Sequence, residues 1–169
     1  MLAPPKPVRV LFDESHSEAW TIRPDVAEAM QPSHPADSSL ARAATALADR
    51  EFEVGAHTEG ELDAAALADA DVLVIAHPSD SKWEATVNGG SPLLTGAEID
   101  AIESFVDAGG GLVVLGETEQ DKYGNNVNDL LAVIVNWNPQ GPVGGNGADL
   151  NRDNKIDPLD LIEVLLHWG

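Results

Sequence analysis

The sequence predicts an α/β fold with a parallel sheet, on the strength of three observations. Short apolar runs alternate with helix-like segments over the first two thirds of the chain. The run at residues 71–77 is apolar almost throughout, which is typical of a parallel strand covered on both faces. The segment 95–108 joins a capping-box pattern to an apolar stripe at helical spacing. Strands linked by helices pair in parallel through right-handed crossovers, so we expect a three-layer sheet with strand order 2-1-3-4.

Each strand is predicted from a short apolar run bounded by polar or turn residues. The expected strands cover residues 8–12, 52–57, 71–77 and 112–115. The helices are predicted from their caps, with Ser38 or Ser39 before the first and Thr95 before the third. Asn126 or Asn128 caps the last one. The expected helices cover residues 38–50, 63–69, 96–108 and 126–137.

Polar side chains follow three of these strands at the points where the strands end. Ligands of such sheets bind at the carboxyl ends of the strands, next to the switch in strand order. His16 follows the first strand, His77 the third and Glu117 the fourth, so these three are candidate catalytic residues. Two histidines among carboxylates also suit a divalent metal. The alternative is that all three side chains hydrogen-bond to the loops around them.

Three segments carry a resemblance to a known family: VRVLFDESHSEAW, DVLVIAHPSD and GGGLVVLGETEQDKYGNN. They resemble a class I glutamine amidotransferase-like domain, which implies a flavodoxin-like α/β domain that we place at residues 1–135. Amidotransferases of this kind carry a cysteine at the turn after the strand equivalent to 112–115. This chain has Gly116-Glu117-Thr118 there and no cysteine anywhere. Glutamine hydrolysis by a thiol nucleophile is therefore excluded.

Oxygen-bearing side chains recur at regular spacing in the segment DLNRDNKIDPLD, near the C-terminus. Counted from its first residue, they occupy positions 1, 3, 5, 9 and 12 of a twelve-residue loop, with a backbone carbonyl ligand at position 7. This is the spacing of an EF-hand calcium loop. Asn154 replaces the usual glycine at position 6, and asparagine tolerates the left-handed backbone needed there. We predict one Ca²⁺ bound by Asp149, Asn151, Asp153, Lys155, Asp157 and Asp160.

An apolar helical pattern, LIEVLLHWG, follows Asp160 directly, and a similar one, LLAVIVNWN, follows Asp129. The calcium loop and its helix resemble a type I dockerin, which we place at residues 136–169. The resemblance implies a cohesin domain as partner and a polysaccharide-degrading context. The first copy has no matching loop, because Thr118, Gln120 and Lys122 stand at the equivalent positions. One calcium site is therefore expected, and not two.

The composition restricts partners and compartment. A net charge of −20 and a pI near 4.2 argue against nucleic acid and anionic membranes as partners. The absence of cysteine removes disulfides and cysteine metal sites. No apolar run is long enough to span a membrane, and the first ten residues lack the apolar region of a signal peptide. The dockerin-like segment indicates an extracellular protein and the start of the chain a cytoplasmic one, and both stay open.

Two functions from different classes follow from these patterns. In the first, the protein is a non-catalytic modular protein with a calcium-binding docking tail. In the second, the α/β domain is a hydrolase or lyase of unknown substrate that uses His16, His77 and Glu117, and the tail only localises it. The missing cysteine favours the first.

Overall fold

The structure of the chain is a computed structural model that describes residues 6–30, 38–115 and 120–136. Glu117 and the six predicted calcium ligands lie outside the described residues, as does the rest of the dockerin-like segment beyond residue 136. The chain divides into two compact units, Met1–Val127 and Asn128–Gly169. All four described strands belong to the first unit.

The sheet is parallel and has the predicted strand order. Its strands are β1 (Arg9–Asp13), β2 (Glu53–His57), β3 (Val72–Ile75) and β4 (Gly111–Val114), arranged as β2-β1-β3-β4. The predicted strand positions are confirmed to within two residues at each end. As expected for the most apolar run, β3 is the most buried strand, and its last three residues are inaccessible to solvent or nearly so.

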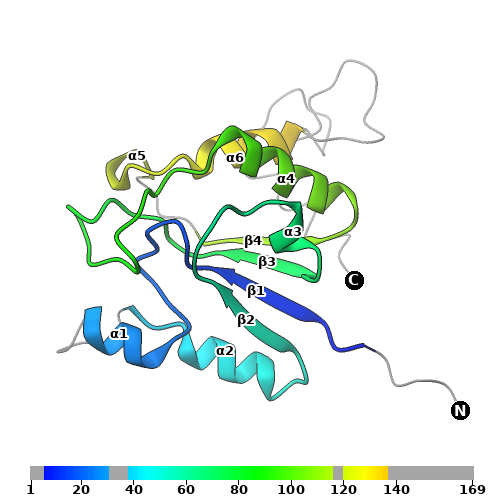
Figure 1. Cartoon of the computed structure of the whole chain (residues 1–169), viewed down its shortest axis with the longest axis horizontal. Helices are drawn as coiled ribbons and strands as arrows, with labels where there is room; N and C mark the ends of the chain where they lie inside the picture. The colour runs from blue at the N-terminus through cyan, green and yellow to red at the C-terminus, as the bar shows by residue number, and fades with distance from the viewer. Residues whose placement is uncertain (1–5, 31–37, 116–119, 137–169) are drawn as a thin grey trace, which may run out of the picture. The chain divides into compact units, whose positions relative to one another are not determined.

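Six helices are described. They are α1 (Pro24–Met30), α2 (Ala41–Ala48), α3 (Ala64–Leu67), α4 (Gly96–Asp107), α5 (Gln120–Tyr123) and α6 (Val127–Asn136). In Figure 1, α2 lies on one side of the sheet, and α3 and α4 lie on the other. Helices α1 and α5 were not predicted from the sequence. Both are short, and α1 buries only Ala27, so neither produces a clear apolar stripe.

Apolar side chains fill both faces of the sheet. Val10, Phe12 and Val74 form a buried cluster on one face, where Leu40 and Leu47 from the α2 region pack against them. Leu73 and Ile75 point to the opposite face, because successive residues of a strand alternate. Burial of each such side chain contributes about 1.5–3 kcal/mol, which makes this core a firm support for the loops at the strand ends.

The helix ends confirm some predicted caps and correct others. Thr95 forms the predicted capping box with Glu98, and Gly109, at φ +100°, ends the helix. Neither serine begins α2: Leu40 holds the N-cap position, although the Ser39 hydroxyl accepts the N–H of Ala41 at 3.2 Å.

The predicted cap of α6 is also displaced by one residue. Asn125 accepts the N–H of Val127 at 3.2 Å, so it does the capping that we predicted for Asn126 or Asn128. The side-chain amide of Asn126 instead accepts from the backbone N–H of Leu94 and donates to its carbonyl.

Among the described residues, none of the helices has the length and apolar character needed to span a bilayer.

Candidate functional site

The loops after β1 and β3 are joined at the carboxyl edge of the sheet. The backbone of Ala19 donates to the carbonyl of His77 at 2.9 Å, and Ser79 donates to the carbonyl of Ser17 at 3.0 Å. Ser17 adopts φ +57°, which is uncommon for a residue with a side chain, and this turns the chain sharply after β1. The result is a compact polar region that holds both predicted histidines.

His16 is buried and bridges two carboxylates. Its Nδ1 lies 2.7 Å from Oδ2 of Asp13, and its Nε2 lies 3.0 Å from Oε1 of Glu98. An ionised carboxylate only accepts hydrogen bonds, so both ring nitrogens must carry a proton. Burial lowers the pKa of His16, but the hydrogen bonds and charges of Asp13 and Glu98 outweigh this effect, and the pKa is raised. The two carboxylates therefore favour the protonated form of the His16 ring.

Glu98 connects this histidine to the start of α4. Its Oε1 accepts the backbone N–H of Leu62 at 3.0 Å, and its Oε2 accepts that of Thr95 at 2.7 Å. Burial alone would raise the pKa of Glu98, but these donors and the charge of His16 lower it. One carboxylate thus caps a helix, holds the loop before α3 and pairs with the loop after β1.

Ser15 does not complete a nucleophilic triad with His16. The Ser15 hydroxyl donates to Oδ1 of Asp13 at 2.8 Å and lies 3.1 Å from Nδ1 of His16. In a triad the nucleophile and the acid contact opposite nitrogens of the ring, whereas here both contact Nδ1. Since Nε2 is held by Glu98, His16 has no nitrogen left to accept a proton from a substrate.

His77 lies in a second cluster, between two aromatic rings. The ring of Trp20 is 5.2 Å away, and that of Tyr123 is 4.7 Å away in a T-shaped contact. Nε2 of His77 is 2.8 Å from Oε2 of Glu84. Nδ1 is buried and has no hydrogen-bond partner among the described residues. The ring is therefore oriented by Glu84 and enclosed by aromatic side chains.

Glu18, which was not predicted as a site residue, lies between the two histidine clusters in the sequence and contacts His77. Its side chain is fully buried, and its Oε2 accepts the backbone N–H of His77. Burial raises the pKa of Glu18 well above its ordinary value, and the nearby charges of Asp13 and Glu14 raise it further. The neutral acid is thus the favoured form. Its sequence neighbours, Ser17 and Ala19, gave no sign that this carboxyl would turn inward.

In the same region, the buried side chain of Glu14 pairs with Arg23, whose side chain is 35% exposed. Oε2 of Glu14 accepts from Nε of Arg23 at 2.7 Å, while Oε1 accepts from the Thr21 hydroxyl and the Ile22 backbone. Every oxygen of this buried carboxylate is satisfied, as burial of a charge requires. Nη2 of Arg23 is buried without a hydrogen-bond partner among the described residues.

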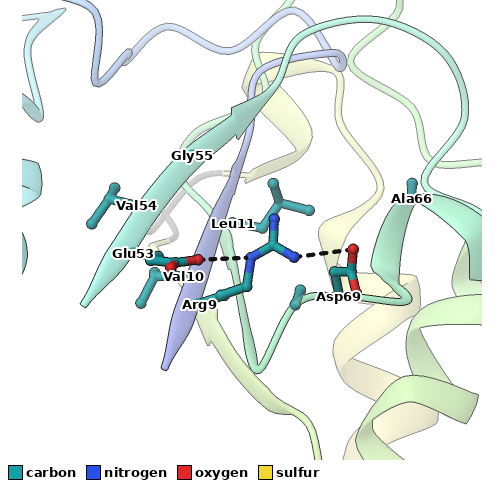
Figure 2. A pocket seen from close by; sticks show the side chains of 9 residues that line it. Arg9, Val10, Leu11, Glu53, Val54, Gly55, Ala66 and Asp69 are labelled. Atoms are coloured by element: carbon teal, nitrogen blue, oxygen red, sulfur yellow. Dashed lines mark ion pairs between the residues drawn. The ribbon is translucent and has the colours of Figure 1, made fainter. Parts of the chain in front are cut away.

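Both histidines are buried, with His16 6% and His77 1% exposed. One groove, shown in Figure 2, is lined by Arg9 and its partners Glu53, at 3.3 Å, and Asp69, at 3.1 Å. It lies where β1 and β2 begin, which is the edge of the sheet remote from the histidines. In the part of the chain that is described, no group of three or more metal-binding side chains is placed to hold a metal ion.

Comparisons with known proteins assign no family. No protein-family model matches the chain, and no curated protein matches it. One solved structure that is similar is described as "mmIFT52 N-terminal domain", with 18% identity and a TM-score of 0.47. The match covers 72% of this chain and 42% of that one, so the chain spans less than half the length of that structure. Both the amidotransferase-like and the dockerin-like resemblances stay predictions.

Proposed function

We propose that this chain is a non-catalytic modular protein in which a flavodoxin-like α/β domain carries a calcium-binding, dockerin-like docking tail. The observation that carries the proposal is the register of oxygen ligands from Asp149 to Asp160. Five oxygen-bearing side chains occupy EF-hand positions, and a helical pattern starts at the last one. This combination is specific for a calcium-binding loop followed by a helix. The strand order 2-1-3-4 supports the flavodoxin-like part of the proposal.

The environment of the two histidines supports the non-catalytic part. Both ring nitrogens of His16 contact carboxylates, and the ring of His77 lies between those of Trp20 and Tyr123. A general base needs an accepting nitrogen within reach of a substrate proton. Nδ1 of His77 has no hydrogen-bond partner among the described residues, which favours the hydrolase or lyase alternative, but His77 is only 1% exposed.

Calcium binding is tested by calorimetry on the full chain. We expect one Ca²⁺ per chain, and loss of the site in the double variant Asp149→Ala/Asp160→Ala, because a position-1 and a position-12 ligand are removed together. The matched control is Asp100→Ala/Asp107→Ala, which removes the same charge from exposed positions of α4. An unchanged calcium isotherm in the loop variant would show that calcium binds through the overall negative charge of the chain and not through this loop.

The docking function is tested with an immobilised type I cohesin domain. Retention that requires calcium, and that is lost on chelation and in the loop variant, is the expected result. Calcium binding without retention by cohesin domains would leave the metal site standing and reject the docking role.

A further inference from the structure

The outer edge of β4 carries backbone groups that have no hydrogen-bond partner among the described residues. β4 is an outer strand of the sheet, and β3 is its neighbour on the inner side (Figure 1). The backbone N–H groups of Gly111 and Leu115 both point inward and donate to carbonyls on the β3 side at 2.9 Å. Alternate residues of a ladder bond to the same neighbour, so the N–H and C=O groups of Leu112 and Val114 point outward. Such a row of free groups is a template for another strand.

The side chains of β4 do nothing to prevent strand addition. Proteins protect an edge strand with charged residues, proline or a bulge. The segment AGGGLVVLG, residues 108–116, has no charged residue and no proline. Val113 and Leu115 lie on one face of the strand and are 43% and 37% exposed. The other outer strand, β2, begins instead with Glu53, whose charged side chain is exposed. The β4 edge is therefore the one open to pairing.

The charge of this edge favours a second copy of the same chain as its partner. Each copy has a net charge of −20, so two copies repel each other wherever acidic surfaces meet. Like charges placed directly opposite each other on paired strands are also destabilising. The uncharged segment 108–116 avoids both penalties when it pairs with itself.

The side chains of β4 are also complementary to themselves in one antiparallel register. With a two-fold axis at Val113, Leu112 of one copy lies opposite Val114 of the other, and the outward N–H and C=O groups of both residues are satisfied. Leu115 then lies opposite Gly111 of the second copy. Glycine has no side chain, so it leaves room for the half-exposed leucine.

We propose that this protein forms a symmetric dimer in which the β4 strands of two copies pair antiparallel and join their sheets into one. Val113 faces its counterpart at the axis, in a non-hydrogen-bonded pair with Cα atoms about 4.5 Å apart. Both copies contribute the same surface, so the assembly closes at two chains. The dimer is independent of the calcium-binding tail, because all the contacts that define it lie within residues 111–115.

Sedimentation velocity on the full chain tests the association. We expect a species of twice the 17.8 kDa of one chain, with a dissociation constant of about 1–100 μM because a short strand pair buries a small area. Sodium chloride should strengthen the dimer, since salt screens the repulsion between two acidic chains.

Charge substitutions at Val113 locate the interface. Val113→Lys and Val113→Glu each place like charges opposite each other at the axis, so each variant alone should associate at least about tenfold more weakly. An equal mixture of the two should recover dimers, because lysine then faces glutamate. Val8→Lys is the matched control: Val8 is 42% exposed but precedes β1, so this variant should associate as the unchanged chain does.

Three results would overturn the proposal. A monomer at about 0.5 mM, with or without salt, would leave the β4 edge to a segment of the same chain. Dimers that persist in Val113→Lys would place the contact elsewhere on the surface. An equal mixture that stays monomeric would reject the two-fold pairing at Val113. Since the Val113 side chain is exposed, both variants are expected to fold, and far-UV circular dichroism checks this.

Discussion

His16 and Glu98 pair across the molecule, with Nε2 of the histidine 3.0 Å from Oε1 of the glutamate. Asp13 holds the other ring nitrogen at 2.7 Å, so one buried imidazole ring bridges two buried carboxylates. This arrangement links the loop after β1 to the first turn of α4. The consequences for stability can be measured without knowing the function.

Replacing His16 should destabilise the domain strongly. In His16→Gln the amide restores some hydrogen bonding but removes the positive charge, which leaves Asp13 and Glu98 facing each other without a cation. Breaking a buried ion pair costs about 3–5 kcal/mol, so we expect a loss of roughly 3 kcal/mol in the free energy of unfolding. Urea denaturation measures it. His57→Gln, at a partly exposed histidine, is the control and should change little.

The same cluster predicts how stability depends on pH. The pKa of His16 is raised in the folded state, so its contribution is complete below its ordinary pKa of 6.5 and is lost as the pH rises through the folded value. The pKa of Glu98 is lowered, so its contribution is present above 4.5 and is lost as the pH falls through the folded value. Stability should therefore peak at mildly acidic pH.

The groups that face His16 in this cluster are Asp13, Ser15 and Glu98. Chemical denaturation from pH 4 to pH 9 tests the profile. His16→Gln should flatten the loss of stability above neutral pH. A wild-type profile that keeps rising from pH 6 to pH 9 would contradict the assignment of an imidazolium.

Glu18→Gln is expected to stabilise the protein at high pH. The raised pKa of Glu18 means that the folded state holds the proton to higher pH than the unfolded state does, and this costs stability as the pH rises above the ordinary pKa of 4.5. Glutamine keeps the shape and an oxygen to accept the N–H of His77, but it has no charge to bury. We expect the variant to differ little from the unchanged chain at pH 5 and to gain in relative stability as the pH rises to 8.

Glu18→Ala is the contrasting variant. It leaves the buried N–H of His77 without an acceptor, which costs about 1–3 kcal/mol at any pH. If Glu18→Gln and Glu18→Ala behaved alike across the pH range, the carboxyl would not be the neutral acceptor described above.

Two glycines form a matched pair for testing the packing. A methyl group at Gly110 would overlap the ring of Phe105, whereas one at Gly55 in β2 would meet no atom within 4 Å. Gly110→Ala should therefore cost about 1–3 kcal/mol through overpacking. Gly55→Ala should be neutral or stabilising by up to about 1 kcal/mol, because alanine loses less backbone entropy in a strand. Thermal unfolding of the two variants side by side gives the comparison.

The sequence by itself determined the parts of this protein that depend on local pattern. Apolar runs predicted the four strands and their parallel order, and Thr95 with Glu98 predicted the start of α4. The twelve-residue oxygen pattern that begins at Asp149 is equally local, which is why it carries a proposal from the sequence alone.

Tertiary structure alone decided the partners of the buried charged groups. Glu98 was recognised as a helix cap, but its pairing with His16 depends on a loop from another part of the chain. Glu14 and Glu18 carried no local signal, because the burial of a charged side chain is decided by what folds around it. A carboxylate can be buried only where donors or a cation converge on it. That convergence arises at the carboxyl edge of the sheet, where crossovers bring distant loops together.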